Sequence, residues 1–216
     1  YLTNPTTAPL LSALFPDAKF IIILRNPVDR AFSAYHHMCR SGYEYISSFE
    51  KAIEVEEARY NSPNFRNKCN SGNLVKYTFV YNYMYFRSGL YAEQIERYLS
   101  YFDRSQFKVI NFSDFAEKPY ETVADLYKFL LVDNDFIPNL SIRNKGSCTT
   151  RIPVLQHIIE TRLGWLPKTI RRPIKHIIST KNSINIQKID PGTRDKLMRR
   201  FDDDQNNLLK LVGFRF

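Results

Sequence analysis

The chain has 216 residues, of which 44% are apolar and 14% aromatic, and its formal net charge at pH 7 is +9. This composition supplies enough apolar surface for a packed core and excludes a disordered or low-complexity chain. The length predicts one domain over residues 1–216. The longest apolar run, Phe20 to Leu24, is much shorter than the roughly 18–20 residues of a membrane-spanning helix.

The positive charge is concentrated in one stretch. Residues 143–200 contain fourteen Lys and Arg but only three Asp and Glu, whereas the rest of the chain is close to neutral. Such a stretch favours an anionic partner. The three cysteines, Cys39, Cys69 and Cys148, include no CxxC pair, which argues against a disulfide framework or a zinc site. A small, odd number of cysteines favours a protein from a reducing compartment, so we expect a cytoplasmic location.

The first predicted elements are a strand and a helix. Phe20 to Leu24 is apolar and rich in β-branched residues, which predicts a strand buried on both faces of a parallel sheet. Pro27 fits the first turn of a helix, and residues 28–38 have helical spacing. Residues 48–60 predict an amphipathic helix, and the Asn-rich residues 61–73 predict a loop.

A second strand and helix are expected further along the chain. Alternating aromatic residues from Tyr77 to Tyr85 predict a strand by their period of two, although an aromatic-lined loop or helix has the same composition. Residues 88–101 predict a helix with Ser88 as its N-cap. Residues 106–112 predict a strand and residues 119–132 a helix. Two strand-helix units indicate an α/β sheet.

The C-terminal third is predicted to be helical after a loop. Residues 133–152 are rich in loop-forming residues, and Pro153 begins a helix that Trp165 to Pro167 interrupts. Asp190 and Pro191 begin a terminal helix that extends to Leu211.

The connection from Leu24 to Ser33 is the first candidate site. Here a strand ends and a helix begins, and the free N–H groups at the start of a helix favour an anion. Arg25 can offer a forked, permanently charged donor to a phosphate, and Ser33 can add a hydroxyl. The residues alone fit equally well an arginine at the edge of a strand and a serine bonded to its own helix.

The run from Lys19 to Tyr35, K-F-I-I-I-L-R-N-P-V-D-R-A-F-S-A-Y, resembles the 3′-phosphate-binding segment of sulfotransferases that use 3′-phosphoadenosine 5′-phosphosulfate (PAPS). The resemblance implies that Arg25 and Ser33 bind the 3′-phosphate of this donor. Asn26 replaces an acidic residue that is common in the family. The resemblance continues in residues 88–102, 109–119 and 189–214.

The resemblance implies a P-loop NTPase-like fold, an α/β three-layer sandwich with a central parallel sheet. It also implies that the sulfotransferase domain is truncated at its N-terminus, because no glycine-containing phosphate loop with a lysine precedes Lys19. The usual catalytic base would lie in the same missing part, so the catalytic residue is unknown. We therefore expect this segment alone to transfer no sulfate. The adjacent His36 and His37 are expected to be surface or packing residues.

Residues 143–153 form a second candidate site. Gly146 allows close approach of the backbone to a ligand, while Lys145 and Arg151 add positive charge, although composition alone favours a solvated basic loop. The family has a glycine-containing basic loop here that folds over the nucleotide. The resemblance therefore implies that Lys145, Gly146 and Arg151 bind the donor, and that Tyr91 contacts its adenine.

Other polar groups carry weaker predictions. The tyrosines between residues 77 and 91 fit an acceptor cleft or ordinary packing. Arg171 to His176 fit a sulfated or carboxylated glycan, nucleic acid or an anionic membrane, but a solvated basic face is the simplest interpretation. Asp202 to Asp204 lack the spacing of metal ligands, so no metal site is predicted.

The resemblance thus predicts transfer of a sulfuryl group from PAPS to an acceptor hydroxyl or amine, with adenosine 3′,5′-bisphosphate (PAP) as the product. The acceptor would be a glycan or a small molecule, and neither nucleic acid nor a membrane segment is expected to take part. The alternatives are a related nucleotide kinase and a basic module that binds polyanions. A kinase requires acidic magnesium ligands, and a polyanion-binding module would show a steep dependence of affinity on salt.

Overall fold

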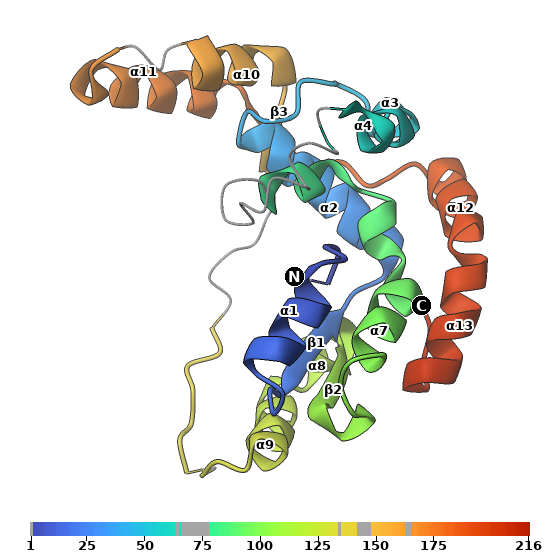
Figure 1. Ribbon diagram of the computed structural model, residues 1–216. Coiled ribbons are helices and arrows are strands. Elements are labelled where there is room, and N and C mark those ends of the chain that lie inside the picture. Colours follow the sequence, from blue (N-terminus) through green and yellow to red (C-terminus); the bar gives the residue numbers. More distant parts are fainter. Residues whose placement is uncertain (1, 64, 66–77, 134, 142–147, 163–165) are drawn as a thin grey trace. The chain divides into compact units, whose positions relative to one another are not determined.

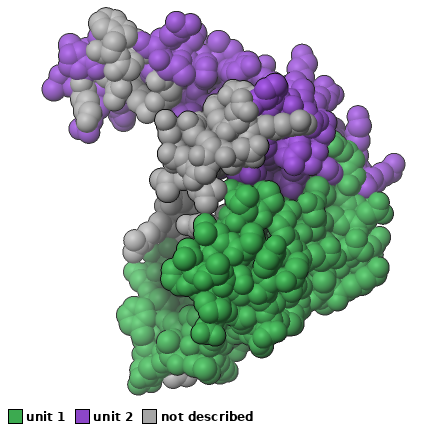
Figure 2. All heavy atoms as spheres, in the orientation of Figure 1, with its two compact units in different colours: residues 1–27, 90–145, 200–216 green, residues 28–89, 146–199 purple. Residues whose placement is uncertain are grey.

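The computed structural model describes residues 2–63, 65, 78–133, 135–141, 148–162 and 166–216 (Figure 1). The chain divides into two compact units (Figure 2). Unit 1 comprises residues 1–27, 90–145 and 200–216, and unit 2 comprises residues 28–89 and 146–199. The single domain expected from the length stays a prediction.

Unit 1 combines parallel strands with helices. Its elements are α1 (Thr7–Leu14), β1 (Phe20–Leu24), α7 (Tyr91–Leu99), the short 3-10 helix η3 (Arg104–Gln106), β2 (Phe107–Asn111), α8 (Phe112–Glu117), α9 (Pro119–Leu130) and α13 (Asp202–Val212). The strands predicted at residues 20–24 and 106–112 and the helix predicted at residues 119–132 are confirmed.

Strands β1 and β2 pair in parallel, with Phe20 opposite Phe107 and Leu24 opposite Asn111. This pairing confirms the parallel sheet. The prediction that β1 is buried on both faces is wrong, because Ile21 and Ile23 are 41% and 48% exposed, whereas Ile22 and Leu24 are buried. Successive side chains of a strand point to opposite faces, so β1 buries only one of its faces. Because the run is apolar at every position, the sequence does not distinguish the exposed face of β1 from the buried one.

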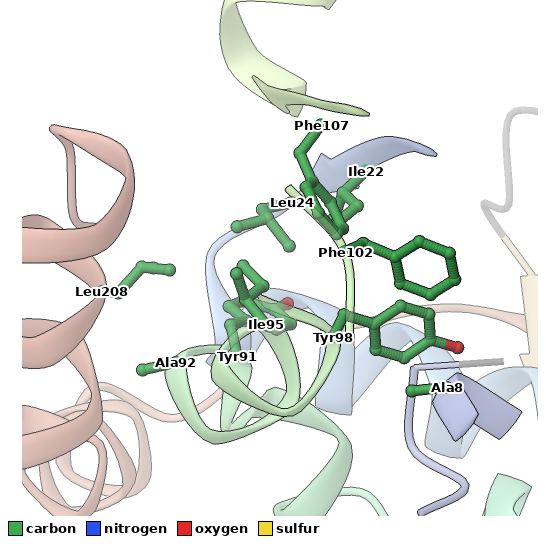
Figure 3. Close-up of a cluster of buried hydrophobic side chains, with 10 residues drawn as sticks. All are labelled: Ala8, Ile22, Leu24, Tyr91, Ala92, Ile95, Tyr98, Phe102, Phe107 and Leu208. Carbon is green, nitrogen blue, oxygen red and sulfur yellow. The ribbon is translucent and has the colours of Figure 1, made fainter. Parts of the chain in front are cut away.

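The core of unit 1 lies on the buried face of β1. Ile22 and Leu24 pack with side chains from α1, α7, β2 and α13 (Figure 3). The cluster consists of Ala8, Ile22, Leu24, Tyr91, Ala92, Ile95, Tyr98, Phe102, Phe107 and Leu208. Phe20 adds aromatic contacts, with its ring stacked at 5.0 Å from that of Phe107. This cluster fixes the strand whose end carries Arg25.

The start of α7 is stabilised by a residue from the C-terminal end of the chain. The carboxylate of Asp204 accepts hydrogen bonds from the backbone N–H groups of Tyr91 and Ala92, at 2.9 and 3.0 Å. These are among the N–H groups that a helix leaves unpaired at its start. The prediction of Ser88 as the N-cap is wrong, because Leu90 occupies that position. Burial raises the pKa of Asp204 despite these hydrogen bonds.

Unit 2 is mainly helical. Its elements are α2 (Pro27–Arg40), α3 (Phe49–Glu54), α4 (Glu56–Asn61), the 3-10 helices η1 (Thr78–Tyr83) and η2 (Arg87–Gly89), β3 (Cys148–Thr150), α10 (Pro153–Arg162), α11 (Lys168–Lys181), β4 (Ser183–Asn185) and α12 (Pro191–Arg200). The helix predicted at residues 48–60 is present as α3 and α4, and Ser48 accepts a hydrogen bond from the N–H of Lys51 at the start of α3.

Three details of the sequence prediction are corrected. The alternating aromatics do not form a strand, because residues 78–83 form η1. The stretch 133–152 is not entirely a loop, because β3 pairs antiparallel with β4. The terminal helix is divided at Phe201, which separates α12 from α13. No helix in the described part of the chain has the length and apolar character needed to cross a membrane.

Candidate functional site

The connection between β1 and α2 has the form that the sequence predicts. Strand β1 ends at Leu24, and α2 begins three residues later at Pro27. The side chain of Arg25 is exposed, and the centre of its guanidinium lies 5.6 Å from the ring centre of Phe112. A cation at this distance from an aromatic ring is attracted to the ring face. Arg25 is therefore accessible to an anion, and the contact with Phe112 restricts the orientation of its side chain.

Tyr91 holds the backbone at the same point. Its side chain is buried, and its hydroxyl donates a hydrogen bond of 2.8 Å to the carbonyl oxygen of Arg25. The structure thus brings Tyr91 and Arg25 together through the backbone. A buried tyrosine in this place fixes the end of β1, whereas the adenine contact expected for it stays a prediction.

Ser33 belongs to α2 and has an exposed side chain. Helix α2 is held within unit 2 by two of its charged residues. Asp29 forms an ion pair with Arg194 of α12, and Arg30 donates a hydrogen bond to the carbonyl oxygen of Tyr85. These contacts fix the helix that carries Ser33.

Lys145 and Gly146 lie outside the described residues, so their predicted roles stay predictions. Arg151, the third residue predicted in this loop, has an exposed side chain at the end of β3. Its backbone N–H donates to the carbonyl oxygen of Asn182 at 2.7 Å, and the Asn182 side chain bonds the N–H and the carbonyl of Ile152. Arg151 and Ile152 are therefore firmly attached to the end of α11.

His36 connects α2 with β3. Its Nδ1 atom lies 2.9 Å from the hydroxyl oxygen of Thr149, and its ring packs edge-on against Phe32. The other ring nitrogen, Nε2, is buried without a hydrogen-bond partner among the described residues. Desolvation by burial lowers the pKa of His36 to about 4. The prediction of a packing role for His36 agrees with this position, while His37 is exposed.

Acid should destabilise the folded protein through His36. The unfolded chain takes up a proton near pH 6.5, whereas the folded chain does so only near pH 4, so stability falls as the pH drops between these values. Replacing His36 with glutamine should reduce the difference between urea unfolding midpoints measured at about pH 7.5 and about pH 5. His37→Gln, on the exposed neighbour, should retain the wild-type difference. Equal pH dependence in the wild type and His36→Gln would contradict this account.

Two buried carboxylates in unit 2 were missed by the sequence predictions. Glu44 is fully buried and accepts two hydrogen bonds from Arg59, at 2.7 and 2.9 Å, and one from the hydroxyl of Tyr85, at 2.9 Å. Glu56 accepts hydrogen bonds from the N–H groups of Phe86 and Arg87, both at 2.8 Å. Burial raises the pKa of Glu56. No sequence pattern marks either residue, because their partners are distant along the chain.

The described residues contain no group of three or more His, Cys, Asp or Glu side chains placed to hold a metal ion. Arg25 is exposed after β1 in unit 1, and Ser33 is exposed on α2 in unit 2. A guanidinium and a hydroxyl can each donate a hydrogen bond to a phosphate.

The sulfotransferase domain family matches residues 5–144, which is more than half of the chain. The chain therefore belongs to this family.

Several curated sulfotransferases are similar to it. Bifunctional heparan sulfate N-deacetylase/N-sulfotransferase 1 of Xenopus laevis is 30% identical over 138 residues, which cover 62% of this chain and 14% of that protein. Human carbohydrate sulfotransferase 15 is 26% identical over 57% of this chain and 22% of its own length. Membrane-associated sulfotransferase kil1 of Dictyostelium discoideum is 23% identical over 62% of this chain and 42% of its own length. The chain thus spans less than half of each of these relatives.

The solved structure of a sulfotransferase from Alicyclobacillus acidocaldarius is 30% identical to this chain, with a TM-score of 0.67. The match covers all of this chain and 63% of the other. This likeness, together with the parallel pairing of β1 and β2, confirms the P-loop-like α/β fold class.

Proposed function

We propose that the protein is a PAPS-dependent sulfotransferase and that Arg25 and Ser33 bind the 3′-phosphate of the donor. The observation that carries the proposal is the β1–α2 connection. A strand end with an exposed arginine leads directly into a helix that exposes a serine, in a chain of the sulfotransferase domain family. Two charge-assisted hydrogen bonds from a forked guanidinium suit a phosphate dianion better than a neutral ribose hydroxyl. This preference would select PAPS over ordinary adenine nucleotides.

In the proposed reaction the bond between sulfur and the 5′-phosphate oxygen breaks, and a bond from sulfur to the acceptor oxygen or nitrogen forms. The acceptor loses its proton, and PAP leaves. Catalysis of this type depends on in-line positioning of the two substrates and on cations that stabilise the leaving phosphate. Arg25 would hold the far end of the nucleotide, while Lys145, Gly146 and Arg151 would surround it. The residue that takes the acceptor proton is not assigned.

We further propose a glycan as the acceptor, bearing either a hydroxyl or an amine. The names of two relatives refer to heparan sulfate and to carbohydrate, and the positive charge of residues 143–200 suits an acidic glycan. The cytoplasmic location expected from the cysteines stays a prediction.

Calorimetry can test the donor assignment with two nucleotides that differ in the 3′-phosphate. The protein should bind PAP at least about tenfold more tightly than AMP, because one charge-assisted contact to the additional phosphate contributes about 1.5–3 kcal/mol. Equal affinity for the two nucleotides would overturn the proposed function.

A further inference from the structure

The segment between α2 and α3 exposes two tyrosines on either side of a buried acid. Tyr43 and Tyr45 are 54% and 52% exposed, whereas Glu44 between them is fully buried. The segment is not helical. Exposure therefore alternates along the segment, with both phenol rings in solvent and the carboxylate of Glu44 in the interior of unit 2.

Hydrogen bonds with four other residues hold the backbone of this segment. The ring of His157 bonds the carbonyl of Gly42 at 2.8 Å, and the hydroxyl of Tyr83 donates to the carbonyl of Tyr43 at 3.0 Å. The N–H groups of Tyr43 and Glu44 both donate to the carbonyl of Met38. The hydroxyl of Tyr35 donates to the carbonyl of Ile46 at 2.9 Å. The segment is consequently rigid although its two tyrosines lie in solvent.

The buried carboxylate of Glu44 also binds the backbone of this segment. Its Oε1 atom accepts the N–H groups of Tyr45 and Ile46, both at 3.1 Å, while Arg59 and Tyr85 bind the same carboxylate. A buried charge is retained only where it is paired and fully hydrogen-bonded, as it is here. The five donors that bind the Glu44 carboxylate fix the backbone that carries Tyr43 and Tyr45. The two rings therefore form a pre-organised surface rather than a mobile one.

Rigid, exposed tyrosines provide a large contact area at a small cost in side-chain entropy. Single exposed aromatic residues are common on protein surfaces, but a pair on one side of a firmly held loop is a suitable binding platform. The ring of His157 lies 5.4 Å from that of Tyr45 and extends the aromatic surface. The flat C–H face of a sugar ring carries a partial positive charge that matches the negative face of an aromatic ring.

The net positive charge of unit 2 favours an acidic ligand. Unit 2 contains nineteen Lys and Arg and nine Asp and Glu, whereas unit 1 has one more acidic than basic residue. Arg40, three residues before Tyr43, is exposed in the same unit. We propose that Tyr43 and Tyr45 form a stacking platform for the sugar rings of an acidic oligosaccharide, which is the acceptor in the proposed function. The inference depends on that function for its role in transfer, but not for binding itself.

Calorimetry with an octasaccharide of alternating glucuronic acid and N-acetylglucosamine tests the platform. The wild type should bind this probe, and Tyr43→Ala and Tyr45→Ala should each weaken binding about tenfold, as loss of one stacked ring does at other binding sites. Tyr43→Phe and Tyr45→Phe should retain affinity within about twofold, because the ring remains. Tyr120→Ala removes a tyrosine of similar exposure, 57%, from unit 1 and should have no effect.

Three results would overturn the platform: no binding of the octasaccharide by the wild type, binding by both alanine variants that is as tight as that of the wild type, or tighter binding of an oligo-thymidine of similar length. PAP is titrated into every variant in parallel. Loss of octasaccharide binding with unchanged PAP binding supports the platform and excludes misfolding as its cause. Failure of the wild type to prefer PAP over AMP overturns the proposed function instead, so the two failures are distinguishable.

Discussion

Arg25→Ala is expected to weaken the binding of PAP by about 10- to 100-fold, while the binding of AMP changes by less than about twofold. The charge-assisted contact of the guanidinium with the 3′-phosphate would contribute about 1.5–3 kcal/mol in total, and 1.4 kcal/mol corresponds to a factor of ten. AMP lacks this phosphate and would lose nothing. The measurement is a calorimetric titration of both nucleotides into both proteins.

Further variants separate charge from geometry at this site. Arg25→Lys retains the charge but not the fork, so its affinity for PAP should lie between those of the wild type and Arg25→Ala. Ser33→Ala removes one neutral hydrogen bond and should weaken PAP binding by about 2- to 10-fold. Arg104→Ala, which removes another exposed arginine of unit 1, should have no effect. If Arg25→Ala weakened PAP and AMP equally, Arg25 would not be the contact to the 3′-phosphate.

The strand and the helix on either side of Arg25 could be predicted because their signals are local. The strand over residues 20–24 follows from a run of β-branched residues, and the helix after it follows from Pro27 and helical spacing. Only a short piece of chain separates Arg25 from Ser33, so a sequence pattern can include the entire unit. The parallel partner β2, residues 107–111, lies within the mainly apolar run 106–112, which predicts a strand for the same reason.

Elements that depend on distant residues could not be predicted. Asp204 supports the first turn of α7 from more than a hundred residues further along the chain, and the nearby Ser88 was a better local candidate. Strands β3 and β4 contain three residues each and lack a long apolar run, so they exist only through their pairing. The aromatic alternation before Tyr85 reflects packing of individual rings, such as Tyr81 against Phe65, rather than the two faces of a strand.

The exposed face of β1 illustrates a different limit. A continuous apolar run predicts burial of both faces, but burial depends on what covers each face, which the run does not encode. The burial of Glu44 likewise depends on residues that are not adjacent to it in the sequence. A lone acidic residue between two tyrosines looks like part of a polar loop, and only the structure shows that it lies in the interior with Arg59 and Tyr85 as partners.

Replacing Glu44 with glutamine is expected to destabilise unit 2 by about 3 kcal/mol, the size of effect seen when one partner of a buried ion pair is removed. Glu44 has no exposed side-chain surface, and Arg59 is only 21% exposed. The amide of glutamine would turn an N–H₂ group toward donors that now bind an oxygen. Because the carboxylate charge that holds Arg59 is lost, this segment should open more often, and the backbone N–H groups of Tyr45 and Ile46 should exchange faster with deuterium. Urea unfolding and hydrogen exchange measure the two effects.

Glu57→Gln provides a matched control. Glu57 pairs with Arg87 at 2.7 Å, the same distance as the pair of Glu44 and Arg59, but its side chain is 64% exposed. Solvent screens an exposed pair, so this variant should change stability by less than about 1 kcal/mol. Combining Glu44→Gln with Arg59→Met should recover part of the loss, because the second change removes the unpaired guanidinium. If the two variants Glu44→Gln and Glu57→Gln changed the free energy of unfolding equally, burial of the ion pair between Glu44 and Arg59 would add nothing to its contribution to stability.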